Sequence, residues 1–149
     1  MTVAPREAPA DVVQRYCIRV PGEKPILTIG LEVEFASGLN VTAVEAPPGW
    51  RGTAQKDRQG RIVGASWEGG SIPPKHALEF GVVARNPGTP TSLVWKAIQK
   101  YQDGSEVHWV GPREAQFPAA VTRVESRRSE SPAPAKECSR EVAPSSGAH

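Results

Sequence analysis

A chain of 149 residues with 38% apolar side chains has room for one ordinary globular domain and a tail. Its 18 basic and 16 acidic side chains leave a net charge of +2 and are spread along the sequence, so charge predicts neither nucleic acid nor an anionic membrane as a partner. No stretch approaches the roughly 20 apolar residues of a membrane span, and the first residues lack the basic and apolar segments of a leader.

The first predicted strand covers residues 12–20, where the side chains alternate in character. Tyr16 and Ile18 fall on one side, and Arg15 and Cys17 fall on the other. This period of two is typical of a half-buried strand. A Pro-Gly pair ends it.

The second predicted strand is the clearest in the sequence. Its apolar side consists of every second residue, namely Leu27, Ile29, Leu31, Val33 and Phe35. Further strands are predicted at residues 41–45, 61–67, 76–85, 93–101 and 106–110. Turn residues separate them, including Asp103-Gly104, a pair typical of hairpin turns.

Seven or eight short strands without a convincing long helix predict an all-β sandwich, since each sheet must bury one apolar face against the other. From residue 126 onward the chain is mostly Ser, Pro, Ala, Glu and Arg, which favours disorder. We therefore expect a domain over residues 2–124 and a disordered Ser/Pro-rich tail over 125–149. Truncation after Val124 is expected to leave the thermal midpoint unchanged.

Motifs of enzymes are scarce, because the sequence contains no phosphate loop, HExxH, paired CxxC or nucleophile elbow. The three histidines, His76, His108 and His149, do not have the spacing of a metal pair. Cys17 and Cys138 fit neither a disulfide framework nor a zinc pattern, so both thiols are interpreted as structural or incidental.

The aromatic residues mostly indicate core packing. Trp50, Trp67 and Trp95 lie in or beside predicted strands, where large aromatics fill sandwich cores. Trp109 stands at the end of the last predicted strand, where packing and function are equally good interpretations. Glu79 falls on the opposite face from the apolar residues of its strand, which indicates a solvated carboxylate unless the fold supplies a partner.

Six segments in order resemble the YcnI-like domain of bacterial copper-handling proteins, from about Thr2 to Val124. They are TVAPREAPA, RVPGEKP, APPGW, ASWEGGSIPP, ALEFGVVARNP and VWKAIQKYQDGSEVHWVGP. Single motifs such as PGW are weak, but the ordered series is specific. The resemblance implies an immunoglobulin- or cupredoxin-like β-sandwich.

The same resemblance implies an exported protein, periplasmic or extracellular, that binds Cu(II) for delivery or homeostasis without turnover. In this family the first residue of the mature chain is a histidine, whose amine and imidazole chelate the ion as a histidine brace. Cu(II) suits such a site because it prefers nitrogen and oxygen donors in a tetragonal plane. The matching metal-site positions here are Glu79, as a carboxylate, and Trp109, as a bulky wall. A copper transporter or a copper chaperone is the implied protein partner.

The chain departs from the family at its beginning, where relatives have a leader and then His-Val-Thr-Val-x-Pro. Here Met1 stands at the position of the valine. A GTG valine codon taken as the start would explain the missing leader and histidine, and the alternative is a cytosolic remnant that lost its metal site. The first explanation predicts a histidine codon directly upstream.

Two other functions remain open from the sequence. The sandwich can act without metal as an interaction module of the cell envelope, through its loops or a sheet edge. A copper-dependent redox enzyme is the third hypothesis, and it would need His76 or His108 as a second histidine ligand.

Overall fold

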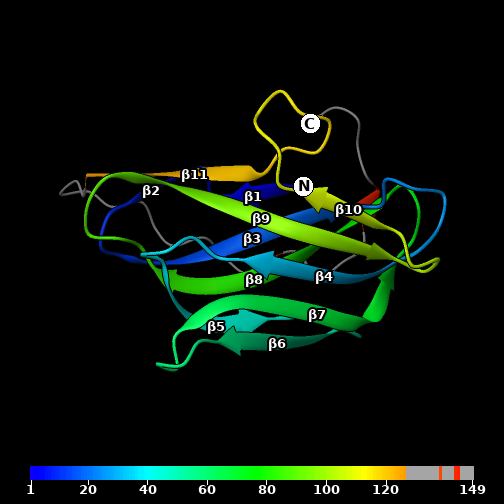
Figure 1. Ribbon diagram of the computed structural model, residues 1–149, viewed down its shortest axis with the longest axis horizontal. Coiled ribbons are helices and arrows are strands. Elements are labelled where there is room, and N and C mark those ends of the chain that lie inside the picture. Colours follow the sequence, from blue (N-terminus) through cyan, green and yellow to red (C-terminus); the bar gives the residue numbers. More distant parts are fainter. Residues whose placement is uncertain (127–137, 139–142, 145–149) are drawn as a thin grey trace.

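The structure is a computed structural model that describes residues 1–126, 138 and 143–144. It confirms the all-β sandwich, in which two sheets face each other (Figure 1). The five-stranded sheet has the order β1-β3-β8-β12, with β5 also paired to β8, and the seven-stranded sheet has the order β2-β11-β9-β4-β7-β6, with β10 also paired to β9.

The described residues form twelve strands, which is more than the seven or eight predicted. The strands are β1 (Thr2–Ala4), β2 (Glu7–Pro9), β3 (Val13–Pro21), β4 (Thr28–Glu34), β5 (Asn40–Glu45), β6 (Arg51–Lys56), β7 (Ile62–Ile72), β8 (His76–Arg85), β9 (Thr91–Tyr101), β10 (Glu106–Trp109), β11 (Ala120–Glu125) and β12 (Ala143–Pro144).

Large side chains from both sheets fill the interior, as the alternating patterns predict. Tyr16 packs against Trp95 with ring centroids 5.0 Å apart, and Phe80 packs against Trp67 at 5.2 Å. Trp67 and Trp95 are buried, whereas Trp50 is half-buried and meets the edge of the Phe80 ring. Burial of such aromatic surface is the main stabilising term of the sandwich.

The predicted apolar face of the second strand is confirmed only in part. Leu31 and Val33 are buried, but Ile29 is 41% exposed and Thr28 is buried in its place. The reason is a register shift between Thr28 and Gly30 in the pairing of β4 with both of its neighbours. Such an irregularity exchanges the two faces of a strand locally.

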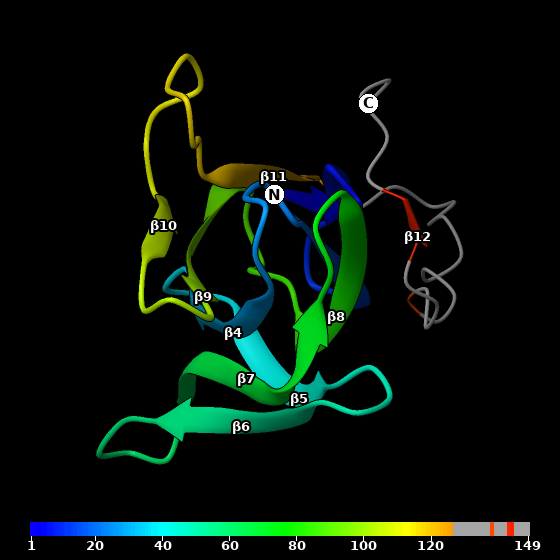
Figure 2. The same ribbon diagram turned by 90° about the vertical axis from the view of Figure 1, so that its right-hand side faces the viewer.

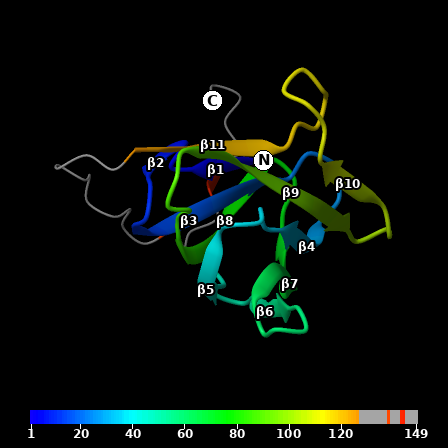
Figure 3. The same ribbon diagram turned by 60° about the vertical axis from the view of Figure 1, so that its left-hand side comes forward.

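The first strands of the chain connect the two sheets. β1 pairs antiparallel with β3 in the five-stranded sheet, and β2 pairs in parallel with β11 in the seven-stranded sheet. Figure 3 shows β2 and β11 side by side. In Figure 2 the N-terminus lies between β10 and β8, which belong to different sheets.

The predicted tail, 125–149, falls largely outside the described residues. Its described part is attached to the sandwich, because Glu125 is the last residue of β11, β12 pairs with the first residues of β8, and Cys138 bonds to Cys17. Across the described residues, no helix has the length and apolar character to span a membrane.

Candidate metal site

Trp109 lies in the interior, at the end of β10. Its side chain is 4% exposed, and its ring meets the edge of Phe117 with centroids 5.2 Å apart. The indole Nε1–H donates a hydrogen bond to Gln99 Oε1 at 2.9 Å. Because an indole has only this one donor, the bond satisfies Trp109 completely and fixes the ring in its plane.

Gln99 is fully buried and connects Trp109 to both sheets. Its Nε2 donates to Thr28 Oγ1 at 2.8 Å and to the Pro21 carbonyl oxygen at 2.7 Å. A buried amide is stable only when its polar atoms are paired, and here both the oxygen and the nitrogen are paired. The network therefore joins β10, β9 and β4 to the end of β3.

The amino group of Met1 lies close to the same end of β3. Since β1 runs antiparallel to β3 with Thr2 opposite Arg19, residue 1 comes to lie beside Val20, next to Pro21. Burial lowers the pKa of this amino group from 8.0 to about 5, and the charge of Glu23 offsets part of the decrease. At neutral pH the amino group is therefore an uncharged nitrogen donor.

The Tyr101 side chain adds an unpaired polar atom to this region. Burial raises the pKa of its phenol, while the Thr28 hydroxyl and the backbone of Glu23 offset part of the rise. The same hydroxyl makes no hydrogen bond of ordinary geometry within the described part of the chain. This hydroxyl is therefore a buried, unsatisfied polar atom.

These groups form what we call the amino-terminal cluster: the Met1 amino group, Glu23, Gln99, Tyr101 and Trp109. Sequence reasoning selected Trp109 from this set and missed Glu23 and Gln99. A signal for Gln99 existed, because it occupies a core position in the alternating pattern of its strand, which is unusual for an amide.

Glu79 lies elsewhere, on the outer face of the five-stranded sheet. It is half-buried and stands opposite Arg19 of β3, and its carboxylate is close to the sulfurs of Cys17 and Cys138. Trp109 belongs to the other sheet and points into the core. The structure thus places both predicted site residues but does not bring them together.

The expectation that the two cysteines form no disulfide is wrong. Cys17 and Cys138 are bonded to each other, although 121 residues separate them in sequence. Spacing gave no indication of this pair, because only the folded chain brings Cys138 next to Cys17.

The histidines of the described residues do not meet. His76 Nδ1 lies 3.1 Å from the Pro74 carbonyl oxygen, and His108 Nε2 lies 3.1 Å from Glu106 Oε1. His149 is outside the described residues. A redox site with a second histidine therefore has no support from the described contacts.

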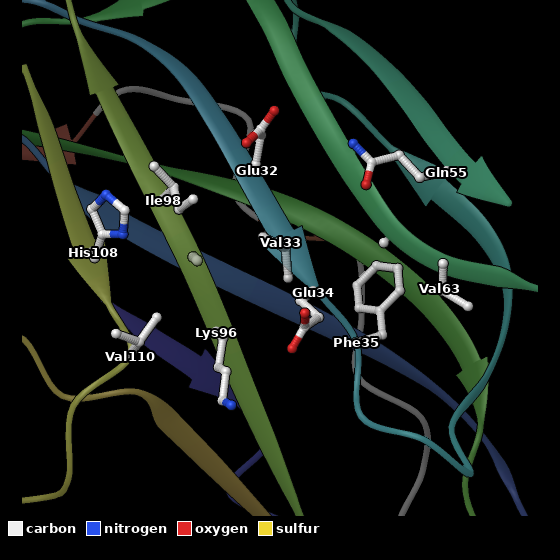
Figure 4. Close-up of a pocket in the computed structure, with 12 residues that line it drawn as sticks. Glu32, Val33, Glu34, Phe35, Gln55, Val63, Lys96, Ile98, His108 and Val110 are labelled. Carbon is white, nitrogen blue, oxygen red and sulfur yellow. The ribbon is translucent and has the colours of Figure 1, made fainter. Parts of the chain in front are cut away.

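His108 borders an open hollow of about 540 Å³ on the outer face of the seven-stranded sheet (Figure 4). Glu32 and Glu34 of β4 line it together with Lys96 of β9. Glu32 pairs with Lys100 at 3.2 Å, so acidic and basic groups are interspersed there. Within the described part of the chain, no three metal-ligating groups converge in this hollow.

Comparison with known proteins identifies the family of the chain. Residues 1–137 match the model of a family described as "Domain of unknown function (DUF1775)". The chain belongs to this family. The predicted YcnI-like membership is confirmed by this match together with the relative described next.

One relative of this DUF1775 chain is the "Copper-binding protein CutI" of Bacillus subtilis (strain 168), which is 31% identical over 130 residues. The alignment covers 86% of this chain and 63% of the relative, so the chain spans less than two thirds of the relative's length.

Solved structures confirm the fold. A protein from Nocardia farcinica, whose structure is described as revealing an immunoglobulin-like fold, superposes with a TM-score of 0.73 at 22% identity, covering 84% of this chain and 99% of that one. A non-cellulosomal cohesin from Archaeoglobus fulgidus gives a TM-score of 0.51 at 15% identity, covering 84% and 89%. Both likenesses concern the fold alone.

Proposed function

We propose that this chain is an exported copper-binding protein that carries Cu(II) for delivery or homeostasis and performs no turnover. The proposal is supported by membership of the DUF1775 family and by likeness to a relative whose name describes it as copper-binding. Copper is then the cargo, and a copper transporter or a copper chaperone is the class of protein that exchanges it.

The observation that carries the proposal is the position of the first residue, which the pairing of β1 with β3 places at the end of β3 beside the buried Gln99–Trp109 network. Burial also lowers the pKa of the amino group there, which favours the proton-free amine that a metal ion requires. Cu(II) prefers nitrogen and oxygen donors, which the amine and the carboxylate of Glu23 represent. The unsatisfied Tyr101 hydroxyl marks a place where a further polar group or water is accommodated.

Trp109 serves in this proposal as a rigid wall beside the ion. It is buried, held by Gln99, and carries no charge that would compete for the metal. A wall of this kind limits access of water and small ligands to the open side of the site and so affects its electronic properties.

The carboxylate of the site has two candidates. The family resemblance proposes Glu79, whereas the pKa of the Met1 amino group responds to Glu23. Substituting each residue in turn distinguishes the two candidates. Glu79 lies on the outer face of the sheet, whereas the charge of Glu23 affects the pKa of the Met1 amine.

The test is a Cu(II) titration by calorimetry with electron paramagnetic resonance, on the Met1 chain and on a variant that begins His-Val before Thr2. The Met1 chain lacks an imidazole next to its amine, so we expect it to bind loosely and the variant to gain one tight site. In that variant, loss of the functional carboxylate by Glu79→Gln or Glu23→Gln should weaken binding roughly ten- to a hundredfold. Trp109→Phe should change the spectrum more than the affinity.

Equal Cu(II) affinity of the Met1 chain and the His-Val variant would contradict the histidine-brace hypothesis. No stoichiometric copper binding by either chain would instead favour the metal-free interaction module of the cell envelope.

A further inference from the structure

The Cys17–Cys138 disulfide lies beside a carboxylate. The sulfurs of Cys17 and Cys138 and a carboxylate oxygen of Glu79 are all within 4.8 Å of one another, and the three residues are half-buried. Among the described residues, Cys17, Cys138 and Glu79 are the three potential metal ligands that the fold brings together. It brings together two soft donors and one hard donor.

The sheet register explains why these groups meet. Cys17 stands opposite Gly81, and its diagonal neighbour on the same outer face is Glu79. Cys138 Sγ lies over Gly81, 3.4 Å from the position that a Cβ would take there. Two neighbouring strands and the segment containing Cys138 therefore each supply one group.

We propose that the reduced cysteine pair and Glu79 form a binding site for a thiophilic d10 metal ion, either Cu(I) or Zn(II), and that the disulfide is the closed state of this site. Opening requires a dithiol reductant. Two electrons and two protons pass to the protein disulfide and give two thiols, while the reductant becomes a disulfide. The ion then displaces the two thiol protons.

The donor set suits such an ion. Thiolates select Cu(I) and Zn(II) over harder ions, at sulfur–metal distances of about 2.3 Å for zinc. Two thiolates suffice for Cu(I), whereas Zn(II) also uses the carboxylate and takes water as its fourth ligand. All three residues are half-buried on the outer face of the sheet rather than enclosed in the core.

Neighbouring charges balance the anionic donors. Arg15 and Arg19 precede and follow Cys17 on the same face of β3. Arg15 forms a two-pronged ion pair with Glu45, at 2.9 and 3.0 Å, which holds its guanidinium beside Gly81, because Glu45 Oε1 is 2.8 Å from the Cβ position there. Positive groups next to a thiol favour its thiolate form, the form that binds metal.

The two sulfurs of this site lie apart from the amino-terminal cluster, and Glu79 is a candidate ligand of both this site and the proposed Cu(II) site. The cysteine pair lies on the outer face of the five-stranded sheet, whereas Trp109 and Gln99 of the amino-terminal cluster are buried in the interior. Cysteine substitutions should therefore leave Cu(II) binding by the His-Val variant unchanged, which makes failure of one proposal distinguishable from failure of the other.

The test compares the full chain, oxidised and reduced, in titrations with Zn(II) alone and with Cu(I) alone. We expect the reduced chain to bind one ion at least roughly a hundredfold more tightly than the oxidised chain or the double variant Cys17→Ser, Cys138→Ser. Glu79→Gln should weaken Zn(II) binding roughly tenfold or more and Cu(I) binding less. The matched control is the exposed carboxylate Glu68, and Glu68→Gln should change neither the Zn(II) affinity nor the Cu(I) affinity.

A second measurement requires no variant, because a bound ion should protect both thiols of the reduced parent chain from alkylation. Circular dichroism establishes that the reduced chain and the serine variant stay folded. The proposal is overturned if the reduced chain binds both ions no more tightly than the serine variant, if the thiols gain no protection, or if Glu79→Gln leaves both affinities unchanged.

Discussion

The amide of Gln99 sets the position of Trp109, which makes a single side chain responsible for the shape of one end of the interior. Its carbonyl oxygen accepts from the indole, and its nitrogen donates to Thr28 and to the Pro21 carbonyl. Because the bond between Trp109 and Gln99 is buried, movement of the ring would leave the indole N–H and Gln99 Oε1 unpaired, which costs about 1–3 kcal/mol for each group. The ring is consequently a fixed part of the amino-terminal cluster.

The Met1 amino group makes stability depend on pH. Between pH 5 and pH 8 the unfolded chain carries a proton on this group and the folded chain does not, so the free energy of unfolding should rise with pH through this window. A pKa change from 8.0 to about 5 corresponds to at most about 4 kcal/mol, reduced by any movement of the chain end toward water on protonation. Denaturant unfolding at pH 5 and at pH 8 measures this change in the free energy of unfolding.

Acetylation of the Met1 amine provides the control, because it removes the titrating group and should flatten this part of the pH profile. If the free and acetylated chains lose the same stability between pH 8 and pH 5, the amino group is not buried as described.

At the residue scale, strand periodicity predicted which way Glu79 points but not its neighbours. The alternation of β8 correctly placed Glu79 opposite the apolar side chains. Its partner Cys138 comes from a segment without a periodic pattern, so no local rule could connect the two. Likewise, Glu23 lies between strands, and only the return of β1 beside β3 brings the Met1 amine within reach of its charge.

At the scale of elements, strands with a clear alternation were predictable, including the four-residue β10, whereas β1, β2 and β6 were not predicted. The bounds of β8 match the prediction, since ten residues give the alternation several periods in which to appear. β1 and β2 have three residues each, which is too short for a pattern, and β6 is largely polar and exposed because it lies at the sheet edge. Their formation depends on partner strands that are distant in sequence.

The turn after β3 is held by a glycine that packs against the start of β8. Gly22 N–H donates to the His76 carbonyl at 2.7 Å, and a Cβ at Gly22 would lie 2.6 Å from the Pro73 carbonyl oxygen. Since this neighbour is backbone, Gly22→Ala should lower the free energy of unfolding by about 1–3 kcal/mol. Chemical denaturation measures the loss.

Gly88→Ala is the matched control, because a Cβ there meets nothing within 4 Å, and it should leave stability within about 0.5 kcal/mol of the parent. Equal effects of the two substitutions would show that the contact between Gly22 and Pro73 is not tight.

At the scale of the whole molecule, the disulfide links the segment around Cys138 to the sandwich and should stabilise it. Cross-linking residues 121 positions apart restricts the unfolded chain, an effect of about 2–4 kcal/mol in proteins of this kind. Truncation after Val124 removes Cys138, so we now expect the thermal midpoint to fall by several degrees rather than to stay unchanged. Thermal unfolding of the oxidised, reduced and truncated chains measures the effect.

The reduced full-length chain is the informative comparison, because it retains every residue and lacks only the bond. Identical midpoints for the oxidised and reduced chains would contradict a stabilising role. A truncated chain less stable than the reduced one would assign the difference to contacts such as the pairing of β12 with β8.

The parallel pairing of β2 with β11 has a consequence for biosynthesis. Residues 7–9 have their sheet partners at 123–125, so the seven-stranded sheet cannot be completed while a ribosome or a secretion channel still holds the end of β11. Contacts of such large sequence separation raise the contact order and place folding in the range of milliseconds to seconds. In an emerging chain β1 can pair early with β3, whereas β2 lacks its partner until nearly all of the domain has been released.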